Sequence, residues 1–117
     1  MDIKVILDRM PDLFPKTDQN YPGIEGLAEG WRTVFMRKHV LLHFSKQAGL
    51  MAGILEQADH SGRHVFDCDA KNAMLDIVCK MLVNAFSLAA AEGFSAKQIT
   101  QRLEELFPKL AEEPHAP

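Results

Sequence analysis

The sequence predicts an all-α protein, a four-helix type of bundle with one short N-terminal helix and three longer ones. Three observations predict it. Apolar residues recur at helical spacing along most of the chain, no stretch alternates apolar and polar residues as a half-buried strand does, and glycine and proline gather between the periodic stretches. With 117 residues, 47% of them apolar and 25% charged, the chain suits one domain with one core. We predict a single helical domain over residues 1–110 and a flexible tail over 111–117.

The first predicted helix covers residues 2–10, where the apolar side chains fall at the i, i+3, i+4, i+7 spacing of one helix face. These side chains are Ile3, Ile6, Leu7 and Met10. Pro11 is expected to end the helix, because proline has no backbone N–H to donate.

Residues 11–30 contain three prolines and three glycines, which predicts a loop. A loop of this length in a compact domain is more often functional or interface-forming than idle. We expect it to lie against the core through four apolar side chains: Leu13, Phe14, Tyr21 and Ile24.

Two long helices follow. The first is predicted from about Ala28 to Gln57, with Gly62 permitting the turn after it. The second is predicted to start at an N-cap on Asp67 or Asp69 and to run to about Glu92. Gly93 then suits the left-handed conformation that commonly ends a helix.

The last predicted helix spans residues 96–110. Ser95 and Gln98 have the spacing of a capping box, in which each side chain accepts a hydrogen bond from the other residue's backbone N–H. Pro108 is expected to end or bend the helix. The apolar residues predicted to form its buried stripe are Ile99, Leu103, Leu106 and Leu110.

A line of polar residues begins at residue 72 and runs along the otherwise apolar helix that follows, residues 73–92. At 100° per residue the line occupies an arc of about 120°; its members are Asn72, Asp76, Lys80, Asn84 and Ser87. The apolar surface that remains is too wide for the other helices of one short chain to cover. We therefore expect a homo-oligomer, a dimer or a tetramer, whose interface uses the alanines and methionines of this helix.

The preceding long helix has a narrow polar face of its own. With His39 as origin, the other members of this face, His43, Lys46 and Gln57, lie within about 40° of it, and Arg32 is on the same side. Two such stripes on adjacent helices could face each other across a groove. The alternative, which the sequence leaves open, is that each stripe faces solvent.

The stretch HFSKQAGLMAGIL, a charged turn, and then DIVCKMLVNAFSLAAAEGFSAKQITQRL resemble the MazG-like and phosphoribosyl-ATP pyrophosphatase superfamily of all-α nucleotide pyrophosphohydrolases. The resemblance covers about residues 35–106. In that family, a Glu-Glu pair and a third Glu on one helix, with a Glu and an Asp on the next, hold magnesium, which bridges the phosphates and activates water. The corresponding positions here are Lys46, Gln47, Leu50, Ala73 and Asp76, and only Asp76 keeps the family's residue.

The resemblance therefore implies the fold more strongly than the activity. A single aspartate beside asparagine side chains would hold Mg²⁺ weakly, whereas Lys46 could contact phosphate directly. The implied function is a divergent MazG-like module that binds a nucleotide, another anion or a protein partner. Its implied ligand contacts are His43, Lys46, Gln47, Lys80 and Asn84, with Asp76 as the one metal ligand. The alternative is an active Mg²⁺-dependent pyrophosphohydrolase that cleaves nucleoside triphosphates between the α and β phosphates.

Other constellations are weaker. His39 and His43 are spaced i, i+4 like metal-binding pairs, with Asp76 as a candidate third zinc ligand, but two ordinary, partly exposed histidines are the expected outcome. Cys79 is expected to be a packed core thiol, and Cys68 has no identified activator. Trp31 is expected to anchor the core or an interface rather than to stack on a base.

The composition argues against several classes of partner. The net charge is −3, with a pI near 5.9 and no lysine and arginine cluster that could follow a phosphate backbone, so we expect no nucleic acid partner. No run reaches the eighteen or so uninterrupted apolar residues of a membrane helix, and the first residues do not resemble a signal peptide. We expect a cytoplasmic protein with reduced thiols and no membrane contact.

Overall fold

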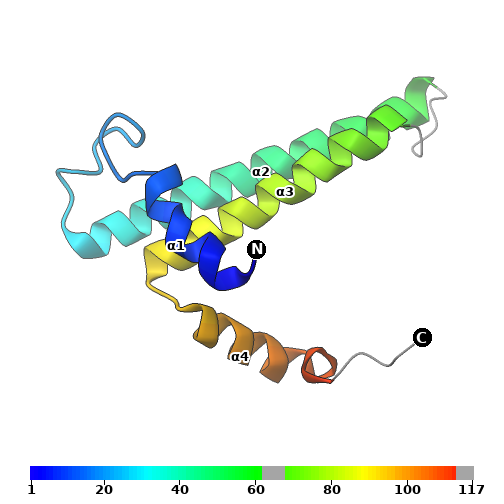
Figure 1. Cartoon of the computed structure of the whole chain (residues 1–117). Helices are drawn as coiled ribbons and strands as arrows, with labels where there is room; N and C mark the ends of the chain where they lie inside the picture. Colours follow the sequence, from blue (N-terminus) through cyan, green and yellow to red (C-terminus); the bar gives the residue numbers. More distant parts are fainter. Residues whose placement is uncertain (62–67, 113–117) are drawn as a thin grey trace.

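The computed structural model describes residues 1–61 and 68–112 (Figure 1). The predicted all-α class is confirmed, because these residues form helices and no strand. In chain order the elements are α1 (Ile3–Leu13), α2 (Glu29–Ser61), α3 (Cys68–Glu92), α4 (Ala96–Leu106) and a short 3₁₀ helix, η1 (Pro108–Ala111).

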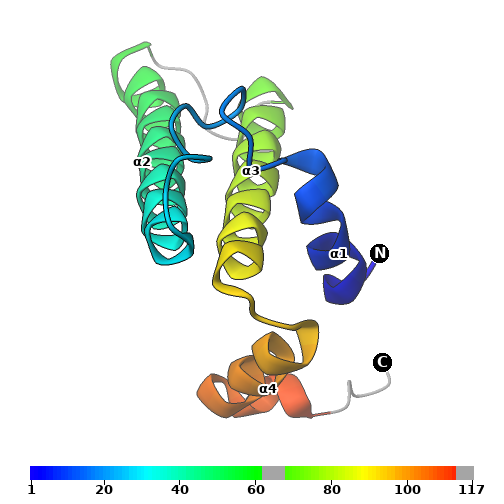
Figure 2. The same ribbon diagram turned by 90° about the vertical axis from the view of Figure 1, so that its left-hand side faces the viewer.

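The two long helices form an antiparallel hairpin that organises the molecule (Figures 1 and 2). Arg37 near the start of α2 pairs with Glu92 at the end of α3, and the Nη2 to Oε2 distance of this two-pronged contact is 3.0 Å. Because residues 37 and 92 lie at one level, the register of the whole hairpin follows from this pair.

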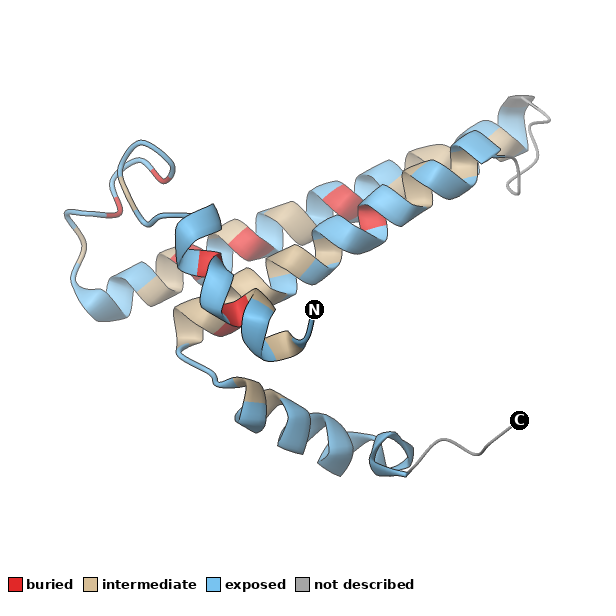
Figure 3. Cartoon of the chain, in the orientation of Figure 1, coloured by how far each residue is buried: buried red, intermediate tan, exposed pale blue. Residues whose placement is uncertain are grey.

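The core is small and follows the contact between α2 and α3 (Figure 3). On α2 the buried residues are Met36, Val40 and Gln47, whose spacing of four and seven places them on one face. Ile77 and Ala89 are the buried residues of α3. Ala89 lies about 120° around α3 from Ile77, so the stripe that α3 buries against α2 is centred on Ile77, and most of both helices lies outside this contact.

α1 packs across α3 and buries Leu7 and Met10. The loop that follows it folds back onto the start of α2, where Tyr21 and Ile24 are buried against Met36. Arg32 holds the end of the loop by donating hydrogen bonds to the backbone carbonyls of Glu25 and Leu27. The prediction that the loop lies on the core is confirmed for Tyr21 and Ile24; it is wrong for Leu13 and Phe14, which are exposed.

Several helix ends differ from those predicted. α1 continues through Pro11 to Leu13, and the N–H of Phe14 closes its last turn on the carbonyl of Met10 at 2.9 Å. A proline in a last turn removes only one hydrogen bond, so it did not end the helix. α2 extends to Ser61 instead of Gln57.

At the other end of the hairpin, Asp69 lies inside the first turn of α3 and is not its cap. Asp67 and Gly62, also assigned to this turn, lie outside the described residues, as do residues 113–117 of the predicted tail.

The signals around α4 are confirmed. Gly93 has a φ of +78°, and Ser95 and Gln98 form the capping box, with N···O distances of 2.8 and 3.1 Å. The helix ends at Leu106, before Pro108. The predicted buried stripe is wrong, however: Leu103, Leu106 and Leu110 are exposed, because α4 contacts only α1 and η1 within the described residues.

The chain is extended for its length. Its radius of gyration is 17.8 Å, whereas a compact chain of this length would have about 13 Å. The chain exposes 9149 Å², whereas a folded monomer of its mass would expose about 6,400 Å². Among the described residues, α3 is also long and apolar enough to cross a membrane by length and composition alone, and only 11% of its most apolar stretch is buried.

Candidate functional site

The predicted site residues on the two long helices lie on one side of the hairpin. On α2, His39, His43 and Lys46 are offset by about 40° to 100° from the core-facing Gln47, in the direction opposite to Arg37. On α3, Asp76 and Lys80 are rotated around the helix axis away from Ile77, in the direction opposite to Glu92. Since Arg37 and Glu92 meet on one side, both polar lines lie on the other.

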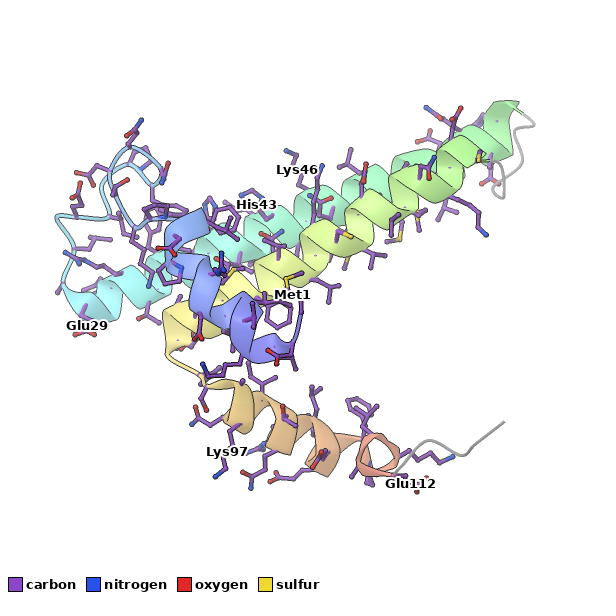
Figure 4. The ribbon with its side chains drawn as sticks, viewed as in Figure 1. Met1, Glu29, His43, Lys46, Lys97 and Glu112 are labelled. Carbon is purple, nitrogen blue, oxygen red and sulfur yellow. The ribbon has the colours of Figure 1, made fainter. Side chains whose placement is uncertain are left out.

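We call this side the polar side and define it by His39, His43, Lys46, Asp76 and Lys80. The neighbouring elements support the assignment. Tyr21 of the loop packs edge-on to His39, with ring centroids 4.8 Å apart, and Ser87 lines a recess with Met10 and Phe14, which belong to or follow α1. The loop and α1 therefore cover the open end of the polar side, and the half nearer the hairpin turn is left uncovered (Figure 4).

The charges on the uncovered half are unpaired. Within the described part of the chain, Lys46, Asp76 and Lys80 make no ion pair and no side-chain hydrogen bond, and all three are exposed. In the hairpin register Lys46 lies near the level of Val83, so Lys46 and Lys80 are about 5 Å apart along the helix axis. Two ammonium groups on opposite helices thus border one strip of surface.

The polar side offers one carboxylate, that of Asp76, to a metal ion. Mg²⁺ takes an octahedral shell of oxygen ligands, usually with one or two carboxylates besides substrate phosphates, so Asp76 as a single magnesium ligand stays a prediction. Among the described residues no three His, Cys, Asp or Glu side chains gather in a way that could hold a metal. The His39, His43 and Asp76 set considered for zinc is therefore not assembled.

The two histidines pack on each other instead. Their ring centroids are 4.4 Å apart, with a tilt of 51° between the planes. Burial lowers the pKa of His39 below its ordinary value of 6.5, and the neighbouring charge of His43 lowers it further. His39 is therefore a neutral ring that packs between Tyr21 and His43.

Gln47 and Asn84, which the resemblance implies as ligand contacts, are placed differently. Gln47 is 3% exposed and lies in the contact between α2 and α3, out of reach of a ligand on the polar side. Its Oε1 is buried and has no hydrogen-bond partner among the residues that the structure describes. Asn84 is half-buried, within about 20° of the core-facing direction of α3.

Three other expectations concern reactive or aromatic groups. Cys79 is exposed, so its prediction as a packed core thiol is wrong; it lies on the surface of α3 that points away from α2. Cys68 is exposed as well. Trp31 is 65% exposed, which excludes it from the core of a single chain.

No family model, no curated protein and no solved structure matches this chain.

Two features of the site were not predicted from the sequence. The Arg37–Glu92 pair joins residues 55 positions apart, and the packing of Tyr21 on His39 depends on the path of the loop. Neither has a local sequence signal.

The first prediction concerns His39. Its pKa is lower in the folded chain than in the unfolded one, so the unfolded state binds the proton more tightly. The stability that His39 contributes is complete above pH 6.5 and is lost as the pH falls from there toward the folded pKa. The free energy of unfolding, measured by urea denaturation, should fall between pH 7.5 and 5.5. We expect this fall to be smaller in His39→Gln. His60→Gln, at an exposed histidine, should leave the loss unchanged; an equal effect from both variants would contradict the assignment.

The second prediction concerns Gln47. A buried acceptor without a donor costs free energy, and methionine has a similar shape without the polar group. We expect Gln47→Met to raise the free energy of unfolding by about 1 kcal/mol, measured by urea denaturation. Gln101→Met, on the exposed surface of α4, is the matched control. A clear destabilisation by Gln47→Met would mean that a ligand or a second chain supplies the missing donor.

Proposed function

We propose that this chain is a non-catalytic interaction module that works as a homo-oligomer, in which two copies pair their α2–α3 hairpins into a four-helix bundle. The observation that carries the proposal is the apolar surface on the side of the hairpin opposite the polar side. We call it the apolar side. Its members are Leu41, Ala48, Ala52 and Leu55 of α2 and Val78 and Ala85 of α3, and all of them are exposed.

The residue types of the apolar side suit helix packing. Three of its six members are alanines, which allow helix axes to approach closely, and the leucines and the valine between them can form ridges. No charged residue lies among them; the Arg37–Glu92 pair marks one end of the surface. Interfaces between identical subunits are likewise poor in charge at their centres.

The area to be covered is large enough for a stable dimer. Relative to a compact monomer the chain exposes an excess of about 2,700 Å². Residues 62–67 and 113–117 could together expose at most about 1,800 Å². When this area is subtracted from the exposed area of the chain, and their mass from its mass, an excess of about 1,400 Å² remains. A standard interface buries about 800 Å² per partner, and obligate dimers bury more.

A protein partner explains α3 better than a lipid bilayer does. Asp76 and Lys80 lie near the middle of α3, where a charge in hydrocarbon is costly. A second hairpin on the apolar side covers the leucines and alanines and leaves both charges in water on the polar side. On this proposal the protein is cytoplasmic and is a divergent relative of the MazG-like superfamily that has lost the metal site.

The third prediction tests the dimer. Val78→Glu places a carboxylate in the middle of the apolar side and should weaken association by at least about a hundredfold, because an unpaired charge would be buried. Val5→Glu is the matched control, since Val5 is similarly exposed (41% against 48%) but lies on α1. Light scattering over a dilution series should give a dimer or a larger oligomer for the unsubstituted chain and for Val5→Glu. A monomer for the unsubstituted chain would refute the proposal.

A second candidate function is anion binding on the polar side. It is favoured by one observation, that Lys46 and Lys80 border the same strip of surface without carboxylate partners. Together with His43 they could hold a phosphate or the phosphate chain of a nucleotide as point charges, without a metal.

The fourth prediction tests this binding. Calorimetry with pyrophosphate and with ATP, without magnesium, should show heat of binding that weakens about tenfold or more in the double variant Lys46→Gln, Lys80→Gln. Lys97→Gln on α4 should bind as the unsubstituted chain does. No binding would remove the anion function. Release of pyrophosphate that requires magnesium and is lost in Asp76→Asn would replace it with the pyrophosphohydrolase.

A further inference from the structure

α4 is a formed helix with few packing contacts in its own chain. It stands away from the hairpin and contacts only α1 and η1 among the described elements (Figures 1 and 2). Its apolar side chains nevertheless share one face, which we call the α4 stripe. The stripe consists of Ile99, Leu103 and Leu106, and Leu110 of η1 continues it. Leu106 and Leu110 are 62% and 61% exposed.

Such a helix is not stable by itself. Isolated helices shorter than about 12 to 15 residues are marginal in water, and α4 has 11 residues. The capping box of Ser95 and Gln98 contributes about 1 kcal/mol, too little to offset the cost of nucleating the helix. The remaining sources of stability are the small contact with α1 and burial of the α4 stripe.

A second uncovered apolar surface lies on α3. Leu75, Cys79 and Leu82 point away from α2, more than about 130° from the core-facing Ile77, and all three are exposed. We call this surface the α3 back. α1 packs on α3 beside Ala90, nearer the C-terminal end of the helix, and Leu75, Cys79 and Leu82 lie beyond it. No contact joins α3 to α4 within the described residues, so neither surface covers the other in one chain.

We propose that α4 is an exchange arm whose stripe packs on the α3 back of a second copy. Each chain offers both surfaces, so a two-fold exchange buries two stripes and two backs and leaves no open end. The excess exposed area also exceeds the roughly 800 Å² per partner that hairpin pairing alone needs. This inference rests on the proposed dimer and adds a second contact to it.

The charge of α4 favours a protein surface over a lipid surface. Its polar face carries Lys97 and Arg102 and, against them, Glu104 and Glu105. Amphipathic helices that lie on membranes are rich in lysine and arginine, which anionic lipids attract. With its charges balanced, α4 lacks that attraction.

The fifth prediction is a crosslinking experiment on full-length chains with Cys68→Ser as the background. One tagged chain carries Cys79→Ser and Leu103→Cys, and an untagged chain keeps Cys79. After the two are co-expressed and treated with a short bismaleimide, we expect a crosslinked pair of one tagged and one untagged chain. Gln101→Cys, about 160° from Leu103 around α4, should give about tenfold less product. Leu106→Cys is a second position on the stripe and guards against a local effect of the first.

The outcomes separate the arm from the dimer. If light scattering shows a dimer and the mixed pair is absent, the arm is refuted and the hairpin dimer stands. The arm is also refuted if a single chain with both Cys79 and Leu103→Cys crosslinks only within itself, because α4 then closes on its own α3. If light scattering shows a monomer, both the proposed function and the exchange arm are refuted.

Discussion

The contact between α2 and α3 is the interaction on which the rest of the molecule depends. Two helices side by side can each bury only one stripe, and here these stripes contain Met36, Val40 and Ile77 together with one glutamine. α1 and the loop add Leu7, Met10, Tyr21 and Ile24 at one end of the hairpin only. Most of the apolar surface of a long, apolar helix pair is therefore left for contacts beyond the chain.

The hairpin has two sides with different chemistry, and the Arg37–Glu92 pair lies at one end of the apolar side. One side has histidines, lysines and Asp76; the other has leucines, alanines and Val78. A protein that paired through the second side would keep the first side open to solvent and to small anions. Association and ligand binding would then use separate surfaces of the same two helices.

The position of Gln47 also changes the meaning of the family resemblance. On the proposed resemblance, Lys46 and Gln47 would occupy the positions of a carboxylate pair in the MazG-like pattern, yet neighbours on a helix differ in direction by about 100°. Gln47 points into the hairpin, and Lys46 borders the polar side. The two residues thus have separate roles, one in the core and one on the surface, and the divergent metal site remains part of our proposal.

The sequence alone determined the features that depend on neighbours within a few residues. The helical class, the capping box of Ser95 and Gln98, the left-handed Gly93 and the break at Pro108 are all local, because each depends on backbone groups one turn away. Helical periodicity also placed His43 with Lys46 on one face of α2 and Asp76 with Lys80 on one face of α3, whereas the Arg37–Glu92 contact decided that the two faces share one side of the hairpin. Tertiary structure decided which faces are covered. The burial of Gln47, the exposure of Cys79 and the uncovered stripe of α4 follow from where the helices lie relative to one another, and an apolar stripe has the same spacing whether its own chain or another covers it.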